Sequence, residues 1–287
     1  MKPIEDCNVG IVGLGLMGGA IAINLASSCA VSAARIFAFD TDKKALNAAC
    51  DAGVIGKSFS SPEEMLPFCD MVFLCLNPSA ILEFMDRWMN VFSPGCLITD
   101  IAGIKGSIVS SLEHTLRPDL DFIPGHPMTG SEKAGFANAP YCNFKGKNYI
   151  LTPLKQNKQE NLDFLKALIY RMGFGRITET TAEEHDRKIA FTSQLCHVIA
   201  AALIDCEGDT KITRFGGGSF EDLTRIAMLN VPMWTELFIE NRYELFKRIE
   251  QFKTSLDALK TLIQEENSGE LETRLAAVRD QRIKMTG

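Results

Sequence analysis

Three glycines, Gly13, Gly15 and Gly18, constrain the fold of this chain more than any other feature. They follow the apolar run 8–12 and open a helical stretch over 17–28. Glycines in this spacing let a strand turn into a helix while the backbone stays close enough to contact a pyrophosphate. The segment therefore predicts a strand–turn–helix unit that binds a dinucleotide.

An acidic residue stands where the second strand is expected to end. Asp40 closes the apolar run 35–39, which favours the dinucleotide interpretation over a turn without a ligand. A carboxylate at this place accepts hydrogen bonds from the two adenosine ribose hydroxyls and repels a 2′-phosphate, so NAD is favoured over NADP. We expect the cofactor to be contacted by Gly13, Gly15, Leu16, Met17, Gly18, Asp40, Asn77 and Gly103.

Apolar runs and helical stretches alternate through the first half of the chain. Such alternation is typical of a largely parallel sheet with helices on both faces. It predicts a doubly wound, Rossmann-like α/β domain over residues 1–180. The expected strands are 8–12, 35–39, 71–76, 96–99, 122–123, 148–151 and 175–178, and the expected helices are 17–28, 41–52, 81–91 and 161–172.

The pattern becomes helical at Thr181-Ala182-Glu183-Glu184, which is a capping box. The helix that it opens is expected to reach about residue 206, and its apolar part, 195–204, is expected to be buried. Further helices are expected over 219–229, 233–266 and 270–284. We therefore expect an all-α substrate and dimerisation domain over 181–287. Apolar residues spaced four and three apart between Leu245 and Ile263 predict a helix-packing seam, and with it a homodimer.

Charge and composition exclude several classes of function. The net charge is −6 and no basic run occurs, so nucleic acid is not expected as a partner. No apolar stretch is expected to reach the roughly 18 residues that span a bilayer. The N-terminus lacks an apolar signal segment, so a cytoplasmic location is expected. None of the nine cysteines forms a C-x-x-C pair, so we expect free thiols and no metal site.

The segment 125–135, Gly-His-Pro-Met-Thr-Gly-Ser-Glu-Lys-Ala-Gly, carries the main chemical signal and is expected to form an active-site loop at the end of a strand. It directly follows the apolar pair Phe122-Ile123, and ligands of doubly wound sheets bind at the carboxyl ends of strands. His126 is therefore the strongest candidate for a catalytic group among the four histidines. His114 is expected at the surface, on a polar helix over 110–117. His185 is expected to be structural rather than catalytic.

Two further polar groups leave alternatives open. His197 lies four residues after Ser193, so both occupy one face of an apolar helix. They either satisfy each other or line a ligand pocket. Arg225 either forms a salt bridge with Asp222 or offers its guanidinium to a substrate carboxylate.

Over essentially its whole length, the chain resembles the prephenate/arogenate dehydrogenases, NAD(P)-dependent enzymes of tyrosine biosynthesis. The resemblance rests on segments 13–19, 100–105 and 125–135, on 184–186 with 192–193 and His197, and on 216–227 with 232–234. It implies oxidative decarboxylation of prephenate or arogenate, with His126 as the catalytic histidine. It also implies that Arg225 binds a substrate carboxylate and that Ser131, Glu132, Ser193 and His197 line the pocket. One departure is Gly103, which replaces a serine that the family usually has near the nicotinamide.

Other functions remain as alternatives. A β-hydroxyacid dehydrogenase would have a Lys-x-x-x-Asn pair on its central helix, but Lys188 is followed here by Thr192. A pyrroline-carboxylate enzyme is a second alternative. A non-catalytic dinucleotide-binding protein is a third, and Gly103 mildly favours it, whereas the presence of His126, Glu132 and Arg225 together argues against it.

Overall fold

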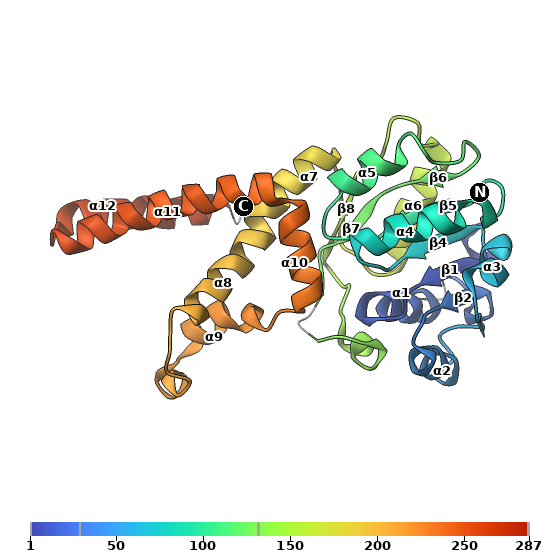
Figure 1. Ribbon diagram of the computed structural model, residues 1–287, viewed down its shortest axis with the longest axis horizontal. Coiled ribbons are helices and arrows are strands. Elements are labelled where there is room, and N and C mark those ends of the chain that lie inside the picture. The colour runs from blue at the N-terminus through green and yellow to red at the C-terminus, as the bar shows by residue number, and fades with distance from the viewer. Residues whose placement is uncertain (1, 29, 131–132, 286–287) are drawn as a thin grey trace. The chain divides into compact units, whose positions relative to one another are not determined.

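A six-stranded parallel sheet organises the first of two units of the chain, Met1–Asn241, in the computed structural model (Figure 1). The structure describes residues 2–28, 30–130 and 133–285. Across the sheet the strands follow the order β3-β2-β1-β4-β5-β6, the Rossmann arrangement expected for residues 1–180. They are β3 (Lys57–Ser58), β2 (Ile36–Phe39), β1 (Val9–Val12), β4 (Met71–Leu74), β5 (Leu97–Asp100) and β6 (Asp121–Phe122).

The chain leaves this sheet directly after β6 and enters a second, three-stranded sheet. There β7 (Gly125–Pro127) pairs antiparallel with β8 (Asn148–Leu151), which pairs parallel with β9 (Arg176–Glu179). We expected the last two strands in the main sheet and a loop from residue 125. Instead, the start of that segment is a strand, and His126 lies opposite Ile150 in its ladder.

Helices cover both faces of the main sheet, as the alternating burial of β4 illustrates. Met71 and Phe73 belong to a core that includes residues of α1 (Leu16–Ser27) and α6 (Gln159–Arg171). Val72 and Leu74 belong to a second core, formed with α4 (Pro78–Trp88) and α5 (Gly106–Leu112). Because successive side chains of a strand point to opposite faces, a strand buried on both sides is apolar throughout, which is why these runs were recognisable in the sequence.

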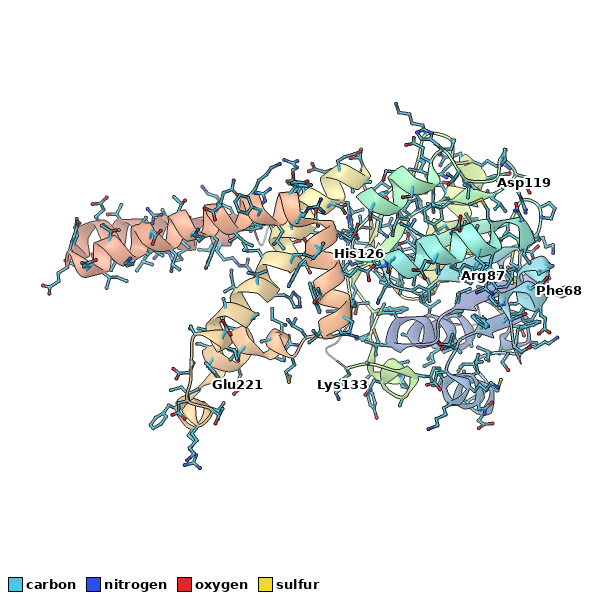
Figure 2. The ribbon with its side chains drawn as sticks, viewed as in Figure 1. Phe68, Arg87, Asp119, His126, Lys133 and Glu221 are labelled. Carbon is cyan, nitrogen blue, oxygen red and sulfur yellow. The ribbon has the colours of Figure 1, made fainter. Side chains whose placement is uncertain are left out.

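The other helices of the first unit are α2 (Lys43–Asp51), α3 (Pro62–Met65), α7 (Ala182–Ile189), α8 (Leu195–Asp205), α9 (Gly218–Thr224) and α10 (Val231–Glu240). The sequence did not predict the short elements α3 and β3, and the helix expected over 110–117 begins earlier, as α5 at Gly106. Figure 2 shows the side chains, with Phe68 and Asp119 at the outer edge of the first unit. His114 lies beyond the end of α5 and is exposed.

The helix that begins after Thr181 differs in two ways from our expectation. A π-helical segment, Ala190–Gln194, joins α7 to α8. In addition, α8 is only partly buried: Leu195 and Ala200 are buried, whereas Leu203 and Ile204 are 37% and 43% accessible. Among its neighbours are α9 and the turn Arg225–Ala227.

We expected no apolar stretch long enough to span a bilayer, but one helical stretch has the necessary length and composition. The helical stretch Ala182–Asp205 meets both criteria, although core helices of soluble proteins also meet them. Ser193, Gln194 and His197 interrupt its apolar surface, and all three line the cavity described below.

The long helix expected over 233–266 is two helices, α10 and α11 (Arg242–Gln264), separated at Asn241. Asn241 is buried, and its amide group donates hydrogen bonds to the Asp186 carbonyl (2.9 Å) and to Gln194 Oε1 (2.8 Å). Thus the Asn241 side chain is hydrogen-bonded to the α7–α8 region. The Asn241 backbone is not helical, so α10 ends there. The second unit, Arg242–Gly287, contains α11 and α12 (Ser268–Lys284), which pack against each other.

Candidate active site

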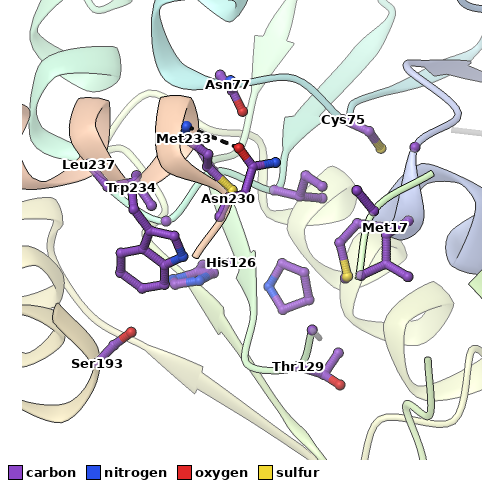
Figure 3. Close-up of a pocket in the computed structure, with 18 of the residues that line it drawn as sticks. Met17, Cys75, Asn77, His126, Thr129, Ser193, Asn230, Met233, Trp234 and Leu237 are labelled. Carbon is purple, nitrogen blue, oxygen red and sulfur yellow. Dashed lines mark hydrogen bonds between the residues drawn. The ribbon is translucent and has the colours of Figure 1, made fainter. Parts of the chain in front are cut away.

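A cavity of about 600 Å³ lies at the carboxyl ends of β1, β4 and β5, within the usual size range of ligand sites. The strand order reverses between β1 and β4, and ligands of open α/β sheets bind at such a point. Figure 3 shows part of its lining. The predicted site residues that line it are Gly15, Leu16, Met17, Gly18, Asn77, Gly103, His126, Ser193, His197 and Arg225.

Each glycine of the first turn has a separate physical role. Gly13 has φ of 92°, and a Cβ there would lie 2.5 Å from the Cys75 carbonyl oxygen. A Cβ on Gly18 would lie 1.8 Å from the Gly13 carbonyl oxygen, so helix and turn pack too closely for any side chain. A Cβ on Gly15 would meet nothing within 4 Å, which leaves open backbone facing the cavity. A pyrophosphate needs such an approach.

Asp40 supports this turn but does not line the cavity, and neither does Gly13. Its carboxylate accepts hydrogen bonds from the Leu14 N–H (2.5 Å) and from the Asp42 N–H (2.7 Å). Because a carboxylate offers about four acceptor positions, Asp40 retains acceptor capacity for ribose hydroxyls. The same side chain can therefore shape the turn and contact a nucleotide.

His126 contacts a second histidine, His185, which does not line the cavity. Nδ1 of His126 lies 2.9 Å from Nε2 of His185, whose Nδ1 lies 2.7 Å from Oδ1 of Asp186. Burial lowers the pKa of His126 well below its usual value, and the neighbouring His185 and Lys105 lower it further. Burial likewise lowers the pKa of His185, although Asp186 opposes this. Both imidazoles are therefore neutral near pH 7.

A buried ion pair lies beneath these histidines. The Lys105 ammonium contacts Oδ2 of Asp100 at the end of β5, and neither side chain is accessible. Asp100 also accepts hydrogen bonds from the N–H groups of Ala102 (2.9 Å) and Gly125 (3.1 Å). The second bond fixes the start of β7, and hence the backbone that carries His126. Burial lowers the pKa of Lys105, and Asp100 acts against that shift.

The far wall of the cavity holds His197 and Ser193. The imidazole of His197 stacks on Trp234, with ring centroids 3.6 Å apart, and its Nδ1 lies 2.9 Å from the Ser193 carbonyl oxygen. A carbonyl can only accept, so Nδ1 donates and Nε2 remains available. Burial lowers the pKa of His197, and the nearby Arg225 adds to that shift. Of the two alternatives for His197 and Ser193, the structure therefore favours the pocket lining.

Gly103 lies under a leucine rather than beside open space. A Cβ at this position would lie 3.3 Å from both methyl groups of Leu237. Thr129 also lines the cavity, but its hydroxyl donates to the Asn143 carbonyl (3.2 Å). Thus Gly103 provides no hydroxyl group, and the Thr129 hydroxyl is hydrogen-bonded to Asn143.

Two predicted site residues, Ser131 and Glu132, lie outside the described residues. The cavity lining also includes polar and apolar residues that the sequence did not predict as site residues, among them Lys133, Gln194, Asn230 and Leu237. His185 was expected to be structural rather than catalytic; a signal was available, because His185-Asp186 is a polar pair directly before a largely apolar helix. Among the described residues, no group of three or more His, Cys, Asp or Glu side chains is arranged to hold a metal ion.

Two family models match the chain, the nucleotide-binding domain of prephenate dehydrogenase over residues 23–178 and its dimerization domain over residues 181–277. The chain belongs to the prephenate dehydrogenase family. Prephenate dehydrogenase of Bacillus subtilis (strain 168) is 27% identical over 288 residues, covering 98% of this chain and 76% of that protein. Cyclohexadienyl dehydrogenase of Zymomonas mobilis is 28% identical over 271 residues, covering 89% and 88%.

Solved structures of the family have the same fold. Prephenate dehydrogenase from A. aeolicus, in complex with hydroxyphenyl propionate and NAD⁺, matches with a TM-score of 0.85 and 31% identity, covering 97% of this chain and 98% of that one. Synechocystis arogenate dehydrogenase matches with a TM-score of 0.78 and 25% identity, covering 96% and 99%. A pyrroline-5-carboxylate reductase from Coxiella burnetii, at 0.52 and 14%, shares the fold alone.

The packing at Gly103 gives a first prediction. We expect Gly103→Ser to be tolerated, with kcat for the family's substrates changed less than about tenfold, or ~1.4 kcal/mol. The flexible methyl groups of Leu237 need to move only a few tenths of an ångström to admit the new Cβ. Steady-state kinetics of both proteins test this. A natural protein that binds NAD but gains turnover only on Gly103→Ser would contradict it, and would favour the non-catalytic alternative.

Proposed function

We propose that this protein catalyses the NAD-dependent oxidative decarboxylation of prephenate to 4-hydroxyphenylpyruvate, or of arogenate to tyrosine. The observation that carries the proposal is the position of His126 in the cavity that begins at the Gly13–Gly18 turn. Names of the relatives include prephenate, cyclohexadienyl and arogenate dehydrogenases. The two substrates differ by a keto or an amino group in the side chain, and we assign the activity to this pair.

The reaction needs a hydride acceptor, a proton acceptor and an anion site. The substrate ring carries a hydroxyl at C4 and a carboxylate at C1. Bound NAD⁺ supplies the hydride acceptor for the hydrogen at C4. Loss of the hydroxyl proton and of CO₂ then leaves an aromatic ring, so the overall step is nearly irreversible and requires no strong base.

The residues at the turn fit a dinucleotide. Gly15 has no side chain, so the space beside its backbone stays open. The first turn of α1 begins at the next residue. The N-terminus of a helix favours an anion there. We assign Gly13, Gly15, Leu16, Met17, Gly18, Asn77 and Gly103 to the cofactor, with Asp40 at the ribose.

His126 is the proposed general base. Because its pKa lies well below its usual value, the ring is neutral and able to accept the hydroxyl proton throughout the neutral pH range. Acidification protonates the base, so kcat/KM is expected to fall only at pH values well below 6.5, the usual histidine value.

The proposed anion site faces this base. Arg225 would bind a substrate carboxylate through its guanidinium fork. His197 and Ser193 would assist, since an approaching carboxylate favours the protonated form of His197 and so makes Nε2 a donor. Ser131 and Glu132 are proposed substrate contacts from the family resemblance alone.

We propose a functional division near residue 180, with a nucleotide domain over 1–180 and a substrate and dimerisation domain over 181–287. The two matched models, 23–178 and 181–277, support it. A homodimer is proposed because the second unit exposes large apolar side chains, including Phe246, Leu256 and Ile263 (64%, 53% and 63% accessible). A cytoplasmic location is part of the same proposal.

The activity is tested with the natural protein and His126→Ala. We expect NADH formation with prephenate, arogenate or both, and none with a 3-hydroxy acid. His126→Ala should lower kcat by about 10²–10⁴-fold, with the NAD dissociation constant nearly unchanged. His114→Ala, which removes an exposed histidine, is the matched control. Loss of NAD binding in His126→Ala would assign that residue a structural role instead.

The anion site is tested with Arg225→Ala. Removing one partner of a desolvated charge pair costs about 2–5 kcal/mol, and we expect the loss mainly in KM for the substrate. Arg87→Ala, on the exposed side of α4, is the control (Figure 2). An unchanged KM in Arg225→Ala would return that side chain to the salt bridge with Asp222.

The cofactor assignment predicts a higher kcat/KM with NAD than with NADP. Replacement of the carboxylate in Asp40→Asn should reduce this preference, since repulsion of the 2′-phosphate is lost while an acceptor for the Leu14 N–H remains. Kinetics with both cofactors measure the ratio. Equal values in the natural protein would refute the role of Asp40.

The dimer is tested by light scattering of the natural protein. At micromolar concentration we expect twice the 31.7 kDa mass of the chain. A monomer mass under these conditions would rule out the proposed association.

A further inference from the structure

Behind His126, the polar contacts continue away from the cavity to His185 and Asp186. We propose that these two residues act as positioning residues that fix the tautomer of His126, so that its unprotonated Nε2 is presented to the substrate hydroxyl. The inference rests on the proposed function only for the identity of the proton donor. The tautomer itself follows from the hydrogen bonds.

The assignment begins at Asp186, whose carboxylate can only accept. Oδ1 accepts from the Lys105 N–H (2.9 Å) and Oδ2 from the Gly106 N–H (2.7 Å). Those two bonds hold the carboxylate in place. The contact of Oδ1 with His185 Nδ1, at 2.7 Å, therefore requires the proton to be on Nδ1.

The next hydrogen bond follows from the first. His185 is only 1% accessible, and burial lowers its pKa, so the ring is neutral and carries one proton. With that proton on Nδ1, Nε2 is an acceptor, and the group within 2.9 Å of it is Nδ1 of His126. Nδ1 of His126 must therefore donate. Nε2 of His126, on the opposite edge of the ring, is left as the free acceptor.

The hydrogen bonds from His126 through His185 to Asp186 also stabilise the positive charge that His126 gains when it accepts the proton. When the hydroxyl O–H bond breaks and an Nε2–H bond forms, His126 becomes an imidazolium whose Nδ1 proton is shared with His185. Any transfer of that proton to His185 Nε2 leaves an imidazolium hydrogen-bonded to the Asp186 carboxylate. The charged groups that face the two rings are Lys105, Asp100 and Asp186. Lys105 and Asp100 are paired, so Asp186 is the remaining counter-charge.

This arrangement involves no group from residue 103. The hydrogen bond that selects the His126 tautomer comes from α7, whereas Gly103 follows β5. The loss of a serine hydroxyl at residue 103 therefore leaves the orientation of the base unchanged. That separation gives a physical reason for the tolerance expected of Gly103→Ser.

The direct test is the tautomer of His126 in the natural protein, measured by ¹⁵N–¹H NMR of labelled histidines. The chain has four histidines, and a His126→Gln sample identifies the signals of that ring. We expect a protonated Nδ1 and a bare Nε2 near pH 7. A protonated Nε2 with a bare Nδ1 would overturn the proposal, whether or not the protein turns over either substrate.

A pair of variants tests the effect on rate. His185→Leu removes the acceptor for His126 Nδ1, and we expect kcat to fall by about 10²-fold or more, with the substrate KM and NAD affinity changed by less than about threefold. His185→Gln keeps an amide oxygen that can accept from Nδ1, so kcat should recover to within about tenfold of the natural value. His114→Leu and His114→Gln are the matched controls.

A merely structural role for His185 gives a different pattern. In that case both variants would lose thermal stability, while the folded fraction would keep the natural kcat. Equal loss of kcat in both variants would also overturn the proposal, because the retained acceptor would then have no effect. If His185→Leu does not fold, the NMR result for the natural protein decides. Failure of the proposed function would appear separately, as a natural protein without turnover.

Discussion

The buried contact between Lys105 and Asp100 is the interaction on which the site depends. Neither side chain is accessible, so removal of one partner would leave an uncompensated charge, at a cost of about 3–5 kcal/mol. Asp100 ends β5 and also holds the N–H of Gly125. Lys105 offers its backbone N–H to Asp186. One ion pair thereby connects the main sheet, the strand that carries His126 and the helix that carries His185.

The site combines two kinds of construction. On the nucleotide side, the backbone shapes the site. Gly13 has a left-handed conformation, the space beside Gly15 is open, and Gly18 packs against the turn. On the substrate side, the site is shaped by side chains held by hydrogen bonds and stacking, as with His197 on Trp234. Between them, the neutral His126 provides a proton acceptor without adding a buried charge to the resting site.

The sequence predicted the elements whose signals are local. The glycine spacing, the runs buried on both faces and the capping box each specify one segment, and β1, α1 and the start of α7 formed as expected. Features that depend on contacts between distant residues could not be predicted in this way. The transfer of β7–β9 to a second sheet depends on pairing between distant strands, and the break at Asn241 depends on its bonds to Asp186 and Gln194. The contact of His185 with His126 joins positions 59 residues apart, so no local pattern could reveal it.

The central claim is that the Nε2 atom of His126 accepts the proton of the substrate's ring hydroxyl. The most direct measurement is a crystal structure of this protein with NAD⁺ and hydroxyphenyl propionate, the ligands of the A. aeolicus structure. We expect the phenolic oxygen within hydrogen-bond reach of His126 Nε2, at about 2.6–3.2 Å, with the ligand carboxylate on the side of Arg225. A ligand bound in the cavity with its hydroxyl directed away from His126 would contradict the account.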